Sequence, residues 1–131
     1  MPQAKATSAP PGAPGARRFR ELAPGEILFA EGDPGSGLLV IQSGRVRLTR
    51  KLAGREQILA ERAAGEIVGE IGVLVGRPQP VTAVAVEPTR CLLVEAAELE
   101  AMVAGDPEIA VRLVRELARN LDAAVAKLYE R

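Results

Sequence analysis

The chain has 131 residues, 47% hydrophobic and only 2% aromatic, which predicts one domain with an aliphatic core. Its 17 Lys and Arg residues balance 17 Asp and Glu residues. A nucleic-acid binder usually carries a basic excess, so we expect no nucleic-acid partner. Histidine is absent from the chain, which removes the usual general base and the commonest metal ligand. We therefore expect neither an enzyme nor a metal site.

The cysteine content points to the cytoplasm. The single cysteine, Cys91, cannot form an internal disulfide, and such a composition is typical of cytosolic proteins. Cys91 begins the apolar run Cys91–Val94, where a buried structural thiol is the expected role. No apolar run approaches the roughly 18 residues of a membrane span, so we expect no membrane partner.

Residues 1–16 are rich in Pro, Gly and Ala, which predicts a disordered or extended tail, a linker rather than a partner-docking arm. From Phe19 onward, short apolar or alternating segments are separated by Gly and Pro turns, a spacing that predicts about eight short strands in a sandwich or barrel. The segments that predict strands are 27–29, 38–41, 45–50, 57–60, 67–68, 81–86 and 90–94.

A different pattern occupies residues 69–76. Two glycines three positions apart, Gly69 and Gly72, enclose Glu70, which suggests a tight loop that enters a short helical turn. Glycines at these positions would also let a ligand approach the backbone closely. The segment 77–80 closes the loop with two prolines.

The last third of the chain is predicted to be helical. A short helix over 98–103 ends at Gly105, and a second begins with Asp106 as N-cap and Pro107 in its first turn, reaching Tyr129. Apolar residues in the second helix alternate by four and three positions and form a seam: Ala110, Val114, Leu117, Leu121, Ala124 and Leu128. The seam is expected to bury against a partner protein, a second copy of the chain, or the chain's own strands. We expect no further domain after it.

Three segments match a known pattern in the right order. They are Pro24–Phe29 with Glu31–Pro34, Leu39–Val46 and Gly65–Gly72. Over roughly 19–128, the chain resembles the cyclic-nucleotide-binding domain family. The resemblance implies a mainly β fold with α, a double-stranded β-helix (a jelly-roll-like β-roll) followed by C-terminal helices. The implied organisation is a tail over 1–16, a β-roll with a short helix over 17–104 and a long helix over 105–131.

The resemblance also implies a ligand site, the family's phosphate-binding cassette. Glu70 would hold a ribose 2′-hydroxyl, and the backbone N–H groups of Ile71 and Gly72 would face a cyclic phosphate. No cofactor is expected beyond cAMP or cGMP as a possible ligand. The candidate ligand-binding residues are Gly69, Glu70, Ile71, Gly72, Gln79, Pro80, Val81 and Thr82.

The sequence departs from the family pattern at the position whose side chain pairs with the negative charge of the ligand's phosphate. The family's cassette arginine aligns with Gln79, and the small residue after it aligns with Pro80. Glutamine brings no charge and proline has no N–H to donate. Arg77 lies two residues early and reaches the pocket only if the loop is altered. We expect no helix-turn-helix after the long helix.

These observations predict a non-catalytic regulatory or interaction module of the cyclic-nucleotide-binding type with weak or no binding of cAMP and cGMP. The alternative is a functional cAMP or cGMP sensor that relays binding through its C-terminal helix to a partner.

Overall fold

The computed structural model describes residues 5–6 and 18–129. The chain divides into two compact units, Met1–Ala96 and Ala97–Arg131, and each is described by itself. Apart from Lys5–Ala6, which form a short strand, the predicted tail lies outside the described residues.

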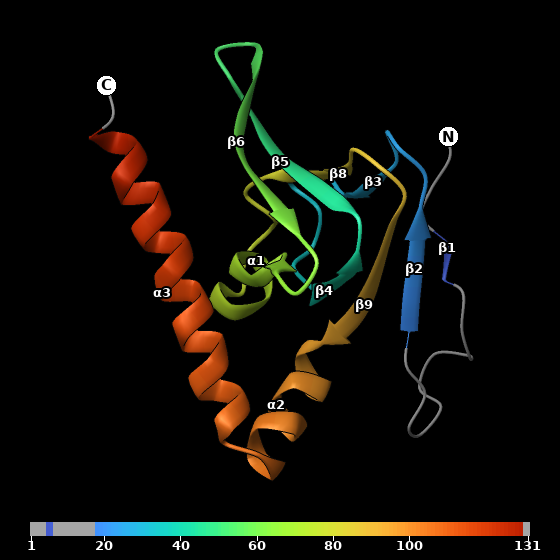
Figure 1. The fold of residues 1–131 in the computed structure, drawn as a ribbon, viewed down its shortest axis with the longest axis vertical. Helices are drawn as coiled ribbons and strands as arrows, with labels where there is room; N and C mark the ends of the chain where they lie inside the picture. Colours follow the sequence, from blue (N-terminus) through green and yellow to red (C-terminus); the bar gives the residue numbers. More distant parts are fainter. Residues whose placement is uncertain (1–4, 7–17, 130–131) are drawn as a thin grey trace. The chain divides into compact units, whose positions relative to one another are not determined.

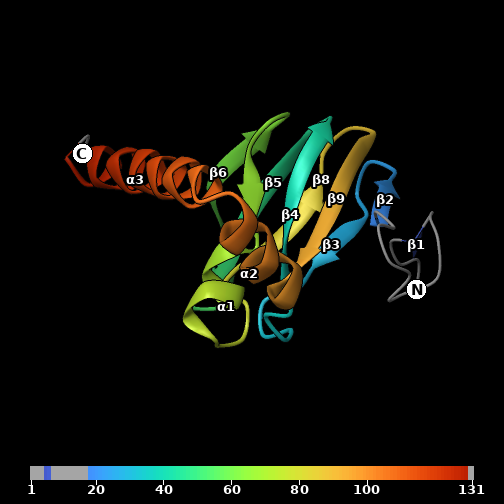
Figure 2. The same cartoon turned by 90° about the horizontal axis from the view of Figure 1, so that it is seen from below.

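The first unit is a β-roll of two antiparallel sheets (Figures 1 and 2). One sheet has the strand order β1-β2-β9-β4-β7 and the other β3-β8-β5-β6. This arrangement confirms the jelly-roll-like architecture that the turn spacing and the resemblance predicted. The strands are β1 (Lys5–Ala6), β2 (Arg18–Leu22), β3 (Ile27–Phe29), β4 (Gly37–Ser43), β5 (Arg45–Leu52), β6 (Arg55–Ala63), β7 (Ile67–Val68), β8 (Thr82–Ala85) and β9 (Thr89–Glu95).

The core of the roll is aliphatic, as the composition requires. Ile41, Val46 and Val68 are almost fully buried and come from both sheets. Cys91 is fully buried among them, and burial raises the pKa of its thiol to about 11, opposed in part by Arg20. The thiol therefore stays protonated at neutral pH and acts as a small apolar side chain.

Two turns that connect strands of the two sheets need glycine at defined positions. Gly44, between β4 and β5, has φ 97°, and a Cβ there would meet the backbone of Pro88 and Thr89. Gly32 has φ 93°. Both positions therefore require glycine, because only glycine adopts this conformation without strain.

A short helix, α1 (Glu70–Val75), lies between β7 and β8. It is flanked by two left-handed glycines, Gly69 with φ 81° and Gly76 with φ 77°. This matches the predicted tight loop that enters a short helical turn.

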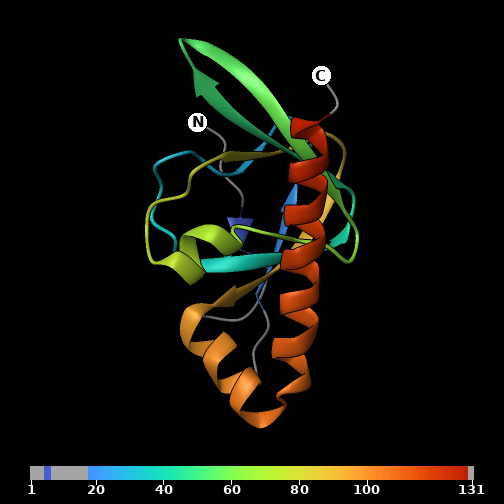
Figure 3. The ribbon, with the colours of Figure 1, turned by 90° about the vertical axis from the view of Figure 1, so that its left-hand side faces the viewer.

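The second unit contains most of α2 (Ala96–Gly105) and all of α3 (Glu108–Leu128), a single continuous helix (Figure 3). The N-cap position belongs to Pro107 rather than to Asp106 as predicted, but the Asp106 carboxylate still accepts a hydrogen bond from the Glu108 N–H at 3.1 Å. Within the described part of the chain, no helix combines the length and apolar character needed to span a membrane.

Candidate functional site

The predicted cassette is held against the turn that follows β3. A Cβ on Gly35 would collide with the backbone of Gly72 and would lie 2.7 Å from the carbonyl oxygen of Arg77. The turn and α1 are thus packed backbone to backbone, and a side chain at position 35 does not fit between them. This contact fixes α1 to the strand region although α1 has only six residues.

Gln79 is attached to the same turn by its backbone. Its N–H donates to the Asp33 carbonyl at 2.8 Å, and its own carbonyl accepts from the Gly32 N–H at 2.8 Å. Its side chain is 4% exposed and lies against α1, where a Cβ on Gly72 would be 2.7 Å from the Gln79 Cδ. Gln79 Nε2 is 3.5 Å from the Cβ position of Gly69. The amide therefore fills the space between Gly69 and Gly72, which we call the glycine recess.

One atom of this amide is not satisfied. Gln79 Oε1 is buried and has no hydrogen-bond partner among the described residues. A buried acceptor without a partner costs roughly 1–3 kcal/mol. The side chain is thus kept in the glycine recess by its backbone anchors and its packing rather than by a hydrogen bond at Oε1.

The other residues of α1 divide between interior and surface. Glu70 is buried in the first turn, with 9% of its surface exposed, and Gly72 is buried behind it. Ile71 is 41% exposed. The structure therefore brings Gly69, Gly72 and Gln79 together around one recess and places the Ile71 side chain at the surface.

The last three predicted site residues lead into β8. Pro80 has no N–H to offer to any ligand. Val81 packs against the core of the roll, and the Thr82 hydroxyl accepts a hydrogen bond from the Glu31 N–H at 2.9 Å. Val81 and Thr82 thus make contacts that stabilise the β-roll itself.

Arg77 is a cation close to the cassette in the sequence, and it is exposed. Its backbone N–H donates to the Gly72 carbonyl at 3.1 Å. This bond helps to end α1 beside the left-handed Gly76. The Arg77 backbone therefore helps to end α1, while Arg77 as a whole is exposed at the surface.

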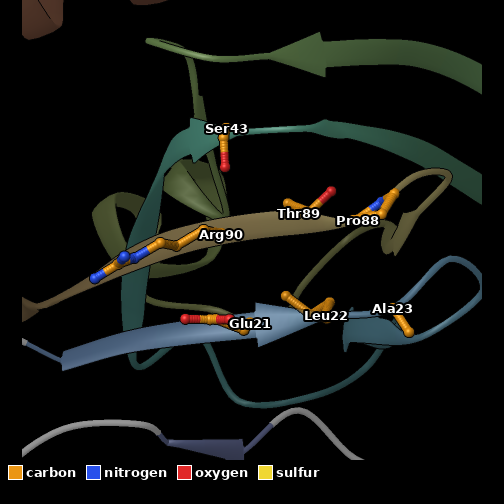
Figure 4. A pocket seen from close by; sticks show the side chains of 7 residues that line it. All are labelled: Glu21, Leu22, Ala23, Ser43, Pro88, Thr89 and Arg90. Atoms are coloured by element: carbon orange, nitrogen blue, oxygen red, sulfur yellow. The ribbon is translucent and has the colours of Figure 1, made fainter.

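A hollow of about 420 Å³ that the sequence did not predict lies elsewhere on the roll (Figure 4). The Thr89 hydroxyl on its wall is engaged with the backbone of Arg45 and Glu87. Glu21 and Arg90 face each other in the β2–β9 register, and the Arg90 guanidinium carbon lies 4.1 Å from the centroid of the Phe19 ring. No sequence signal marks the hollow, because its lining comes from distant segments: Glu21, Leu22, Ala23, Ser43, Pro88, Thr89 and Arg90.

The seam predicted for the long helix lies on α3. Three of its residues are seven positions apart and are largely exposed: Val114 at 63%, Leu121 at 66% and Leu128 at 64%. Between them, Leu117 is half-buried and Ala124 is exposed, while Ala110 is half-buried near the helix start.

A β-roll with a glycine-flanked α1 and C-terminal helices defines a class of regulatory ligand-binding domains. Residues 19–106 match the model of the cyclic nucleotide-binding domain family, and the chain belongs to that family. It is a regulatory domain of this type, as its similarity to the following proteins shows.

Two curated relatives have names that refer to cAMP. The chain is 34% identical over 98 residues to a CRP-like cAMP-activated global transcriptional regulator of Mycobacterium tuberculosis, covering 74% of the chain and 44% of the relative. It is 38% identical over 111 residues to the cyclic AMP receptor protein of Thermus thermophilus, covering 83% of the chain and 51% of the relative. The chain thus spans about half the length of these proteins.

Solved structures agree. The catabolite activator protein of Thermus thermophilus superposes with a TM-score of 0.77 at 35% identity, covering 86% of the chain and 53% of that protein. A cyclic nucleotide-binding domain from Methylobacillus flagellatus superposes with a TM-score of 0.74 at 28% identity, covering 88% of the chain and 65% of that protein.

The comparisons contradict one prediction. We expected no nucleic-acid partner, but relatives of the chain include transcriptional regulators, among them a CRP-like global regulator and the HTH-type regulator Cmr, both of Mycobacterium tuberculosis. The prediction was wrong because net charge describes the surface of this domain alone, whereas the relatives are about twice as long. The family also occurs beside catalysis, since an acetyltransferase, Pat of Mycolicibacterium smegmatis, matches over 50% of the chain and 20% of the enzyme.

Proposed function

We propose that the chain is a non-catalytic regulatory or interaction module that binds cAMP and cGMP weakly or not at all. The observation that carries this proposal is the neutral, buried Gln79 in the cassette. The module would act in the cytoplasm and would communicate through α3.

The electrostatic argument concerns the charge of the ligand. A cyclic phosphate carries a full negative charge, and burying that charge without a cation costs several kcal/mol. A charge-assisted hydrogen bond is worth roughly 1.5–3 kcal/mol, so its loss weakens binding by about one to two powers of ten. Gln79 cannot supply this charge, Pro80 supplies no N–H, and Arg77 lies at the surface.

The alternative is a functional cyclic-nucleotide sensor that relays binding through α3 to a partner. Two observations favour it: Glu70 and the glycines Gly69 and Gly72 are present in α1 and at its start, and relatives carry names that refer to cAMP. The glycines are weaker support than they are in the sequence alone, because Gly72 is also required by its contact with Gln79.

For α3, we propose an interface with a partner protein or with a second copy of the chain. The exposed residues Val114, Leu121 and Leu128 support this proposal, because they recur at the spacing of a helix-pairing seam.

The test is calorimetric titration of the full chain with cAMP and with cGMP. We expect dissociation constants in the high micromolar range or weaker, unchanged in Arg77→Ala. Tight binding at sub-micromolar concentration would contradict the proposal and support the sensor. A marked loss of binding in Arg77→Ala would show that this guanidinium reaches the ligand.

A further inference from the structure

We propose that the Gln79 side chain is a built-in occupant of the glycine recess, and that it determines what can enter the cassette because any ligand must first displace it. This inference rests on the proposed function only in taking the cassette as the ligand site. It adds a steric reason for weak binding that is independent of the missing charge.

The first argument is volume. A Cβ on Gly72 would lie within 2.8 Å of Gln79 Cδ, Nε2 and Oε1, so the amide is in direct contact with the α1 backbone. Real Cβ atoms do not approach other atoms so closely, and a side chain and a ligand cannot share this space. With 4% of its surface exposed, Gln79 is enclosed in the recess rather than resting at its entrance.

The second argument is anchoring. Both backbone hydrogen bonds of Gln79 end on the turn at Gly32 and Asp33, so the base of the side chain is fixed relative to α1. The turn itself is fixed to α1 through Gly35. The occupant is therefore attached by the same contacts that hold the cassette together.

The third argument is that no hydrogen bond at Oε1 holds the Gln79 amide in the recess. This atom has no partner among the described residues, so moving the amide out breaks no hydrogen bond there. The recess is closed by packing, and a competing group with better hydrogen bonds can open it. A ligand that binds only the open form has its apparent affinity reduced by the fraction of molecules that are open.

The direct test is a double-mutant cycle on thermal stability in the full chain, with Gly72→Ala, Gln79→Ala and both together. We expect Gly72→Ala alone to lower Tm by about 3 °C, because the new Cβ forces the enclosed amide to move. In the Gln79→Ala background, Gly72→Ala should cost little or even stabilise, since alanine favours a helix over glycine. Equal losses in both backgrounds, or failure of both Gly72→Ala proteins to fold, would overturn the proposal.

Gly69→Ala is the matched control. Its φ of 81° strains any alanine, and Gln79 Nε2 is at an ordinary contact distance of 3.5 Å. Its loss of Tm should therefore persist in the Gln79→Ala background. Rescue of Gly69→Ala to the same extent as Gly72→Ala would mean that Gln79→Ala acts by general loosening, which contradicts a specific occupant.

A second measurement links the occupant to binding. Gln79→Met keeps a side chain of similar length in the recess, whereas Gln79→Ala empties it, and neither adds a cation. Titrated with cAMP, Gln79→Ala should bind at least about threefold more tightly than Gln79→Met. Equal affinities, or no detectable binding in either variant, would contradict the occupant. Sub-micromolar cAMP binding by the unmodified chain would instead contradict the proposed function, while the stability cycle would still judge the occupant by itself.

Discussion

The cassette is tightly packed by the chain's own residues, whereas the apolar seam of α3 is exposed to solvent. In the cassette, the chain fills its own recess: Gln79 lies between Gly69 and Gly72, and Gly35 brings two backbones into contact. On α3, Val114, Leu121 and Leu128 stay largely exposed. A region that is already packed needs no further molecule for its stability. An exposed apolar seam, by contrast, is stabilised when another surface covers it, because apolar area is removed from water. This contrast is the basis of the proposal that the domain communicates through α3 more than through a small molecule.

The largest expected effect comes from opening the packed contact of the cassette. Gly35→Ala should destabilise the chain by about 3 kcal/mol or more, because the collision is with backbone that cannot rotate away. Gly105→Ala is the control, since a Cβ there meets nothing within 4 Å. Urea unfolding measures both, and similar midpoints for the two variants would show that the cassette is not tightly packed.

The next effect restores the missing charge. Gln79→Arg combined with Pro80→Ala should tighten cAMP binding by about ten- to a hundredfold, since it returns a cation and an N–H donor. Pro80→Ala alone is the control without the cation. Calorimetric titration compares them, and no gain in the double variant would mean that more than charge has been lost from the site.

The corresponding change on α3 is Leu121→Asp. If a second copy covers the seam, this variant should weaken self-association by tenfold or more, because it buries a charge in an apolar interface. Helix content should not change, since Leu121 is 66% exposed. Light scattering compares it with Arg119→Asp on the opposite helix face. An unmodified chain that is strictly monomeric at high micromolar concentration excludes the second copy and leaves a partner protein.

A smaller effect concerns the start of α3. Asp106→Ala removes the carboxylate that accepts from the Glu108 N–H and should cost about 1 kcal/mol, measured by thermal unfolding with circular dichroism. Asp122→Ala, near the end of the same helix, removes a carboxylate without this contact and should have less effect. An equal effect of both changes would exclude a specific capping role.

The smallest expected effect at neutral pH is the contribution of Cys91 ionisation to stability. Cys91 lies in the strand core, outside both the cassette and α3. Its pKa is raised from 9.0 to about 11 in the folded state. The unfolded chain therefore ionises first, so this contribution to stability is present below pH 9 and is lost as pH rises toward 11. The difference in urea unfolding between the unmodified chain and Cys91→Ala isolates it. Rapid labelling of the thiol at pH 8 in the folded protein would contradict the burial.

Sequence reasoning predicted the architecture well because its signals are local. Gly/Pro turns around short apolar segments, and the 4–3 spacing on the long helix, each depend on neighbouring residues only. It identified Gln79 as the altered position but could not place the side chain, because that depends on the turn at Gly32–Asp33, far away in the sequence. It missed the hollow lined by Glu21, Ser43 and Arg90 for the same reason.

The sequence by itself determined that this chain is an aliphatic β-roll with a long amphipathic helix, and that its cassette carries no arginine at position 79. Composition and periodicity settle the aliphatic strands and the amphipathic helix, since these follow from which side chains can be buried and how often they recur. The cassette and its altered position 79 follow from the resemblance to the family. Only the tertiary structure decided that Gln79 fills the glycine recess and that Gly35 is needed for backbone contact. Those facts depend on the distance between segments that meet only after folding, and no local pattern encodes that distance.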